Sequence, residues 1–148
     1  MKALKMAMTG VLALGVSGIA TADQFEDAIN YRQAAFTLIK GNFGPMGAMV
    51  KGDMPFDSAS FAEHAANVAA VAPMADDGFI DGSDMGDTKA KAAVWEDRAE
   101  FDEHMQEFQK LTQELAVAAK SGNMDEIKPK FAAVGKACKS CHDDFKSK

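Results

Sequence analysis

Apolar side chains recur at helical spacing in four stretches of the chain, approximately residues 25–50, 58–72, 88–121 and 124–145. No segment of the chain shows the strict apolar and polar alternation of a half-buried strand, and residue types that favour helix are abundant. In the first stretch the steps alternate between four and three residues, which produces a heptad stripe. Its members are Phe25, Ile29, Arg32, Phe36, Ile39, Phe43, Met46 and Val50. The pattern therefore predicts an all-α fold.

Glycine, proline and capping residues set the expected ends of the first two helices. Gly41 and Pro45 lie in the second half of the first helix and predict a bend or break there. The second helix is expected to begin after an N-cap at Asp57 or Ser58. It is expected to stop before Pro73, because proline cannot donate the backbone hydrogen bond that continues a helix.

A long loop and two further helices follow. Residues 74–87 are rich in glycine and aspartate and have no apolar period, which predicts an acidic connection. Asp87 or Thr88 is expected to open the third helix, and Asn123 is expected to cap the fourth. Pro129 predicts a kink or a late start in the fourth helix.

The lengths of the connections indicate how these helices assemble. Short first and third connections join antiparallel neighbours, and the longer second connection joins the two pairs, as in an up-down-up-down antiparallel four-helix bundle. The inner stripe of the fourth helix includes Cys138 and Cys141. Both cysteines are therefore expected to face the centre of the bundle.

The first 22 residues differ in composition from the rest of the chain. Lys2 and Lys5 precede an apolar stretch at residues 11–19, and small residues at 20–22 provide a cleavage site. This order is typical of a secretory signal peptide, and the apolar stretch is too short for a comfortable membrane span. Cleavage would leave residues 23–148, a length that suits one domain.

The charge of the chain limits its partners. Removal of the leader would change the formal charge from −6 to −8, because Lys2 and Lys5 are lost and no acidic residue goes with them. An acidic surface without a basic run argues against nucleic acid and against an anionic membrane as partners. We therefore expect a soluble exported protein, located in the bacterial periplasm.

The string Cys138-Lys139-Ser140-Cys141-His142 carries the most specific chemistry in the sequence. The C-x-x-C-H spacing is the attachment signature of c-type haem. Two thiols one helical turn apart can form thioether bonds to the haem vinyl groups, and the adjacent imidazole can ligate the iron. The export signal supports this interpretation, because bacterial haem attachment of this kind takes place outside the cytoplasm.

Two other interpretations of the cysteine pair are weaker. A redox-active dithiol would belong at a helix N-terminus in a βαβ setting, which the pattern does not provide. A zinc site would need two more ligands, and only His64 and His104 could supply them. We expect both histidines to lie at the surface or at its boundary with the core.

Around the haem string the sequence resembles cytochrome c-prime (cytochrome c′), the class II c-type cytochromes. The resemblance includes residues 31–36, with the sequence YRQAAF, the Val94-Trp95 pair, the Gly122-Asn123 turn and residues 134–136 ahead of the string. It covers the whole chain after the leader. Class I cytochromes c differ, because they carry the string near the N-terminus.

The resemblance implies one covalently attached haem c and a set of residues around it. Cytochromes c′ are themselves established examples of the four-helix bundle with this topology. The resemblance places Arg32 near the haem propionates, Gln33 among the cofactor-binding residues and Phe36 over the distal face of the haem. It places Lys146 beside the ligating imidazole, and we expect Trp95 to pack against the porphyrin.

Arg32 and Phe36 also need an explanation from their own chemistry. Arg32 interrupts an apolar stripe, so its charge requires an anionic partner or a route to solvent. A haem propionate would serve as the partner, and extension of the side chain to solvent at the end of the bundle is the alternative. Phenylalanine cannot bind iron, so Phe36 at the distal face would leave a five-coordinate iron open only to small ligands.

The rival ligation would use a methionine from the first helix. Met46 and Met49 are the nearest candidates. They lie about 15 Å or more beyond Phe36 along the helix axis, too far to replace it without a break in the helix.

Three functions follow, in order of preference. The first is a periplasmic haem protein, not an enzyme, that binds nitric oxide and carbon monoxide and buffers or removes nitric oxide. The second is an electron carrier whose acidic surface docks a basic redox partner. The third is turnover of peroxide or nitrogen oxides, for which no distal acid or base is evident. The resemblance also implies a homodimer formed through the first two helices.

Overall fold

The computed structural model describes residues 19–148, so most of the predicted signal peptide, residues 1–22, lies outside the described residues. Five helices form: α1 (Ile19–Lys51), α2 (Ser58–Asp77), α3 (Ala93–Glu96), α4 (Arg98–Ala119) and α5 (Met124–Phe145). Within the described range there is no strand, only an isolated antiparallel bridge between Ala90 and Lys146. The all-α prediction is confirmed, whereas the cleavage site after Ala22 stays a prediction.

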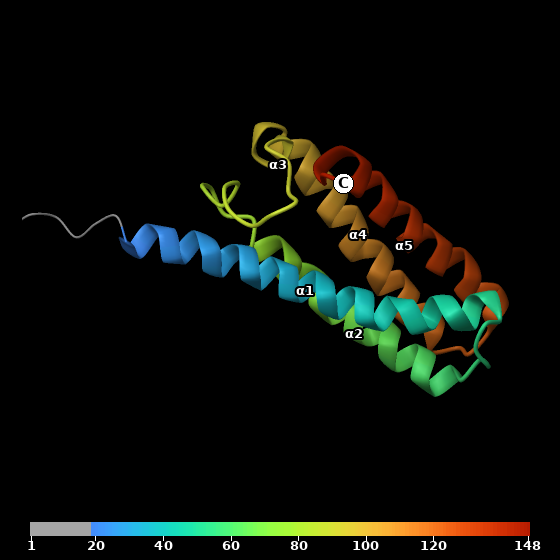
Figure 1. Ribbon diagram of the computed structural model, residues 1–148. Helices are drawn as coiled ribbons and strands as arrows, with labels where there is room; N and C mark the ends of the chain where they lie inside the picture. Colours follow the sequence, from blue (N-terminus) through green and yellow to red (C-terminus); the bar gives the residue numbers. More distant parts are fainter. Residues whose placement is uncertain (1–18) are drawn as a thin grey trace, which may run out of the picture.

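The four long helices form the predicted up-down-up-down antiparallel bundle (Figure 1). Helix α2 packs against both α1 and α4, and α4 packs against α5. Helices α1 and α5 make little contact with each other. The bundle is therefore open along one side, between its first and last helices. Among residues 19–148, none of the helices combines the length and the apolar character that a membrane span requires.

A break in the first helix and the end of the second helix before Pro73 are both wrong predictions. Helix α1 runs through Pro45 without a break, and α2 continues past Pro73 to Asp77. In both cases one direct neighbour of the proline is fully buried, since Met46 and Ala72 are 0% exposed. Because tertiary packing supplies most of the stability of a helix in a protein, it outweighs the single hydrogen bond that proline removes.

The predicted start of the third helix is also wrong. Residues 78–92 form a non-helical segment, which we call the strap, and the short helix α3 precedes α4. The strap pairs with the end of the chain: the Lys91 backbone N–H donates to Phe145 at 2.9 Å, and that of Ser147 donates to Lys89 at 2.8 Å. Residues 89–91 are therefore not helical, and their backbone pairs with the end of the chain.

The N-caps predicted for the second and fourth helices are present. Asp57 accepts a hydrogen bond from the Ser60 backbone N–H at 2.7 Å, and Asn123 accepts one from that of Asp125 at 3.0 Å. Helix α5 begins directly after Asn123 and includes Pro129, so the predicted late start is wrong.

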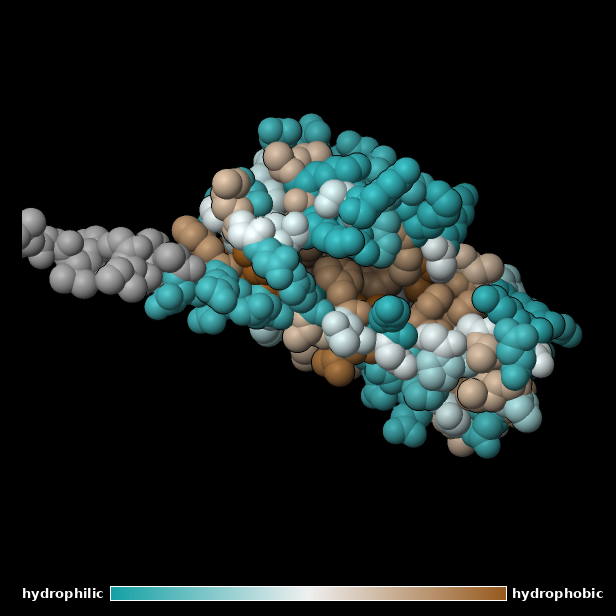
Figure 2. Space-filling model, in the orientation of Figure 1, coloured by the Kyte–Doolittle hydropathy of each residue, from teal (hydrophilic) through white to brown (hydrophobic). Residues whose placement is uncertain are grey.

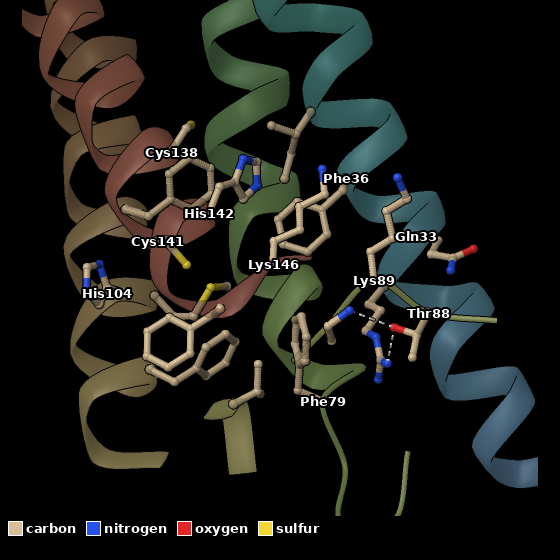
Figure 3. A pocket seen from close by; sticks show the side chains of 18 of the residues that line it. Gln33, Phe36, Phe79, Thr88, Lys89, His104, Cys138, Cys141, His142 and Lys146 are labelled. Atoms are coloured by element: carbon tan, nitrogen blue, oxygen red, sulfur yellow. Dashed lines mark hydrogen bonds between the residues drawn. The ribbon is translucent and has the colours of Figure 1, made fainter. Parts of the chain in front are cut away.

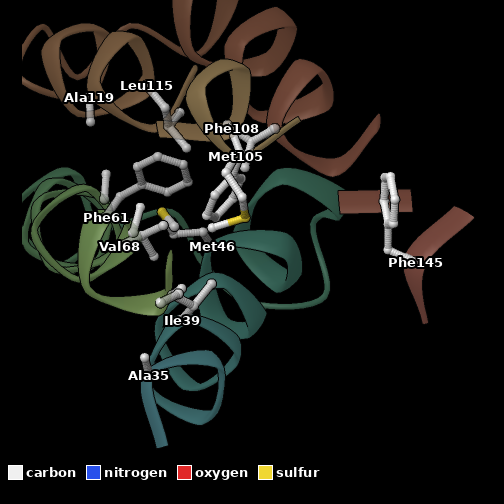
Figure 4. Packing of buried hydrophobic residues seen from close by; sticks show 14 of the residues in the cluster. Ala35, Ile39, Met46, Phe61, Val68, Met105, Phe108, Leu115, Ala119 and Phe145 are labelled. Atoms are coloured by element: carbon white, nitrogen blue, oxygen red, sulfur yellow. The ribbon is translucent and has the colours of Figure 1, made fainter. Parts of the chain in front are cut away.

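The two helix turns at residues 52–57 and 120–123 lie together at one end of the bundle, which we call the closed end (Figure 1). Gly122 has a φ of +64°, which favours glycine, and a Cβ there would come within 3.3 Å of Ser58. Large side chains fill the interior next to these turns (Figure 4). Met46, Phe61, Val68, Leu115 and Ile127 are each 0% exposed.

The strap and the C-terminus lie at the opposite end, which we call the open end (Figure 1). The strap starts at Gly78, where a Cβ would come within 2.6 Å of the Arg32 Cβ and 2.9 Å of the Ala28 carbonyl oxygen. Glycine is required here because the strap leaves α2 in direct contact with α1. At this end the α1 stripe is only partly covered, and Phe36 and Phe43 are half-buried.

Candidate haem site

A cavity of about 660 Å³ occupies the open end, between α1 and α5. Figure 2 shows it as a hollow with hydrophobic walls and hydrophilic residues around its mouth. Its volume lies within the range of about 300–1,000 Å³ that is typical of small-molecule and cofactor sites. The strap closes one end of the cavity, and α4 contributes the fourth wall. The principal lining residues are Arg32, Gln33, Phe36, Lys40 and Phe43 from α1; Phe79, Thr88 and Lys89 from the strap; Phe101, His104, Met105 and Phe108 from α4; and Cys138, Cys141, His142, Phe145 and Lys146 from the end of the chain.

The C-x-x-C-H string lies in the last turns of α5, and its three functional side chains line this cavity (Figure 3). Cys138 and Cys141 are free thiols and half-buried. The helical repeat places the thiols, three residues apart, on one face of α5, and brings His142 toward the same space. Residues from the predicted haem string are therefore gathered at one cavity wall.

The thiols do not have the properties of a redox-active pair. Burial raises the pKa of Cys138, and burial together with the nearby Cys138 and Asp144 raises the pKa of Cys141 to about 11. Catalytic thiols instead have a lowered pKa, often at a helix N-terminus, whereas these lie near a helix C-terminus. The geometry therefore favours covalent attachment over thiol–disulfide chemistry.

His142 is suited to ligate a metal. Partial desolvation at the cavity wall lowers the pKa of its imidazole, and the positive charge of Lys146 lowers it further. The neutral ring, which is the form that ligates metals, is thereby favoured. Lys146 also lines the cavity and ends α5 through its backbone N–H, which donates to the His142 carbonyl at 3.2 Å.

Phe36 projects into the cavity from α1, across from the string on α5 (Figure 3). It meets the ring of Phe79 edge to face, with 6.3 Å between centroids. Met46 and Met49, the alternative iron ligands, are 0% and 6% exposed and belong to the hydrophobic core instead of the cavity wall. The side chain that faces the string from α1 is thus an apolar ring.

Arg32 is buried and held by the strap, whereas its predicted contact with a haem propionate stays a prediction. It is 2% exposed, so it does not extend to solvent, and among the described residues its hydrogen-bond partners are neutral. Nη1 donates to the Gly78 carbonyl at 2.8 Å and to Ser83 Oγ at 2.7 Å. Nη2 donates to the Ser83 carbonyl at 2.8 Å and to Thr88 Oγ1 at 2.9 Å. Burial lowers its pKa.

These four bonds give Arg32 a structural role beside the predicted one. They use all the terminal N–H groups of the guanidinium, so Nε–H is the donor left for a propionate. The main observed role of Arg32 is to fix the strap against α1. Gln33 has a related role, because it lines the cavity and its Nε2 donates to the Asp87 carbonyl at 2.7 Å.

Trp95 supports the strap from α3. Its Nε1 donates to the Ile80 carbonyl at 3.0 Å, and its ring lies 6.2 Å from that of Phe79. It is not among the residues that line the cavity. The structure thus places Trp95 one layer behind the cavity wall, and its expected contact with the porphyrin stays a prediction.

Several wall residues were missed from the sequence. Phe79, Thr88 and Lys89 lie in the strap, where no periodic pattern indicates which side chains turn inward. His104 is at the core boundary, as expected, but it also lines the cavity and packs edge-on against Phe145 at 5.6 Å between centroids. His64 instead lies away from the cavity and pairs with Asn42 at 3.0 Å.

The residues present fit a haem c group. The cavity offers two attachment thiols and one imidazole on α5, and an apolar wall on α1 and α4. Lys40, Lys89 and Lys146 bring exposed positive charge to its lining, which suits the two propionates of a haem.

Comparison with known proteins gives a consistent result. The profile of the family described as Cytochrome C′ matches residues 27–146. Cytochrome c′ from Rubrivivax gelatinosus is 43% identical over 123 residues, which cover 82% of this chain and 95% of that protein.

Solved structures are similar over nearly the same length. Cytochrome c prime from Shewanella frigidimarina has 55% identity and a TM-score of 0.82, and the match covers 84% of this chain and 97% of that one. A nitric oxide complex of a variant of cytochrome c prime from Alcaligenes xylosoxidans has 35% identity and a TM-score of 0.78, covering 84% and 96%.

Proposed function

Because the chain belongs to the cytochrome c′ family, whose members carry covalently attached haem c, we propose that it is a periplasmic protein that binds nitric oxide and carbon monoxide. In this proposal Cys138 and Cys141 hold the haem and His142 ligates its iron. Bound haem supplies an iron atom that can coordinate a diatomic gas. The protein then acts as a buffer or protectant against nitric oxide, not as an enzyme.

The observation that carries the proposal is the position of Phe36. Its ring projects into the cavity from α1, across from the string on α5, and it has no atom that can ligate iron. With haem bound, a ring on this side would leave room near the iron only for a small ligand. Nitric oxide is bound in solved structures of cytochrome c prime from Alcaligenes xylosoxidans, which supports the choice of gas.

Spectroscopy of the purified holoprotein tests the proposal directly. Optical and electron paramagnetic resonance spectra of the ferric and ferrous forms should show a high-spin, five-coordinate iron. Carbon monoxide and nitric oxide should each change the ferrous spectrum. A low-spin, six-coordinate iron with no response to carbon monoxide would contradict gas binding.

Cell experiments test the protective role and the location. A strain that lacks the gene should grow poorly with a nitric oxide donor, and the wild-type chain should restore growth. The Cys138→Ser/Cys141→Ser variant should fail to restore growth although its export is unchanged. Equal growth of all strains would contradict protection, and recovery of the protein from the cytoplasmic fraction would contradict export.

The electron-transfer alternative is favoured by one observation. Lys40, Lys89 and Lys146 are exposed among the residues that line the cavity, although the chain as a whole is acidic. A partner would therefore present an acidic surface to this region, the reverse of the basic partner expected from net charge alone. Transfer rates with an acidic partner should fall as ionic strength rises; rates independent of salt would argue against docking here.

We also propose that the chain forms a homodimer through α1 and α2. Tyr31 and Leu38 are 46% and 55% exposed, and lie on one face of α1. Met74 on α2 is 48% exposed. Light scattering of the holoprotein should give twice the mass of the chain, and a monomer at all concentrations would contradict the proposal.

A further inference from the structure

Phe79, the second residue of the strap, is the aromatic neighbour of Phe36. The two rings meet edge to face, with centroids 6.3 Å apart and planes at 70°. Both line the cavity, but they come from different elements, and Figure 3 shows them projecting into the same space. The two rings together form one side of the cavity.

The ring of Phe79 is fixed from several directions. It is 9% exposed, and its centroid is 4.7 Å from that of Phe101. The guanidinium of Arg32 lies over it at 4.7 Å. Its carbonyl accepts a hydrogen bond from Arg98 at 2.9 Å. Since Arg32 is itself held by four hydrogen bonds, Phe79 has little freedom to move.

Phe36 is less constrained. It is half-buried, and one side of its ring faces the cavity. A gas that coordinates iron beneath this ring needs the ring to turn about its side-chain bonds. Phe79 occupies the space on one side of the ring, so it blocks one of the directions in which Phe36 can turn.

We propose that Phe79 determines access to the gas site by holding the ring of Phe36 over the iron. The inference rests on the proposed function, because it concerns the rate at which a gas reaches that iron. Phe79 acts here as a positioning residue, through Phe36 and not by contact with the ligand. The strap thereby sets how readily the distal pocket opens.

A plain packing role for Phe79 makes a different prediction. If Phe79 only filled space, its replacement would loosen the open end in general and would act whether or not a ring is present at position 36. If Phe79 holds Phe36, its replacement has an effect only when that ring is present. Measuring both substitutions singly and together separates these cases.

The test measures carbon monoxide association with the ferrous holoprotein of wild type, Phe79→Leu, Phe36→Ala and the double variant. Phe79→Leu alone should raise the association rate about three- to tenfold, as expected when an edge-to-face aromatic contact is lost. In the Phe36→Ala background the same change should leave the rate unaltered. Phe61→Leu is the matched control, because Phe61 is 0% exposed and lies outside the cavity lining.

A structural readout accompanies the rates. In a crystal structure of the unliganded Phe79→Leu holoprotein, the ring of Phe36 should turn into the space that Phe79 vacates. Thermal unfolding and the optical spectrum verify that each variant is folded and carries haem. If Phe79→Leu does not fold, Phe79→Met, which retains more volume, should show the same rate increase and the same dependence on Phe36.

The possible failures are distinguishable. If the wild-type protein does not bind carbon monoxide, the proposed function itself fails. If the wild type binds it and Phe36→Ala accelerates binding while Phe79→Leu does not, only the role of Phe79 is overturned. An effect of Phe79→Leu that persists in the Phe36→Ala background, or an equal effect of Phe61→Leu, would likewise overturn it.

Discussion

The two ends of the bundle are built from the same helices but filled in different ways. At the closed end the α1 stripe continues into Met46, which is 0% exposed and belongs to the same core cluster as Phe61 and Leu115. At the open end the same stripe passes through Phe36 and Phe43, which are half-buried because they face a cavity of about 660 Å³. The difference shows that a heptad stripe indicates which face turns inward, but not whether protein or cofactor covers it.

The ends also differ in how their helices are joined. At the closed end short turns connect antiparallel neighbours directly. At the open end the strap joins α1 to the end of the chain, because Arg32 holds one part of it and the bridge between Ala90 and Lys146 holds another. The open end is therefore stabilised by the strap and, once attached, by the haem.

Loss of the haem should have the largest effect on the stability of the protein, and this effect should be confined to the open end. In the Cys138→Ser/Cys141→Ser variant we expect no covalent haem and a loss of more than about 5 kcal/mol in unfolding free energy, since the vacant space exceeds that left by any single side-chain truncation. Hydrogen exchange should become fast in residues 25–36 and in the strap. Met46 and Leu115 at the closed end should stay protected.

Ser140→Ala is the control for the haem-free variant, because it alters the same string and keeps both thiols and the imidazole. It should retain haem on a haem-stained gel and exchange like the wild type. Uniform loss of protection over both ends in the double cysteine variant would contradict the separation of the two ends.

Truncation of the closed-end core should have the next largest effect. Leu115→Ala removes a side chain that is 0% exposed, and should lower the unfolding free energy by about 3 kcal/mol. Carbon monoxide binding should not change, because Leu115 lies outside the cavity lining. Urea unfolding and flash photolysis of the same holoprotein measure the two quantities. Phe36→Ala should give the opposite result, with faster gas binding and a smaller loss of stability.

The sequence predicted the closed end better than the open end. Asp57 and Asn123 cap their helices as expected, because a side-chain cap depends on residues within one helical turn. The C-x-x-C-H string identified the cofactor, since its spacing depends only on one turn of α5. In contrast, the continuation of α2 through Pro73 depends on the burial of Ala72 against other helices. Local helix propensity carries no information about such contacts.

The conformation of the strap could not be predicted either, because it too depends on contacts between residues far apart in the sequence. Its conformation depends on partners far away in the chain, such as Arg32 for Ser83 and Phe145 for Lys91. Arg32 itself was recognised as a charge that needed partners. Its partners proved to be neutral oxygens of the strap, and a sequence without periodicity gives no signal for such contacts.

Removal of the Arg32 side-chain donors should lower the stability by a smaller amount, and only the open end should be affected. Arg32→Gln leaves several buried oxygens of the strap without donors, so we expect a loss of about 2–3 kcal/mol in unfolding free energy. Strap amides should exchange faster while closed-end amides do not change. Arg98→Gln is the matched control, because Arg98 also binds the strap but its side chain is 39% exposed. Its effect should be smaller, and an equal effect would contradict the central role of Arg32.

Removal of the closed-end cap should have the smallest effect. Asp57→Ala deletes the carboxylate that accepts from the Ser60 N–H at 2.7 Å, and should lower the unfolding free energy by about 1 kcal/mol. Asp53→Ala is the control, since Asp53 lies in the same turn but caps no helix. Neither change should alter carbon monoxide binding or strap exchange. A change in gas binding on loss of the Asp57 cap would mean that the closed end transmits strain along α1 or α2 to Phe36, so that the two ends are one cooperative unit.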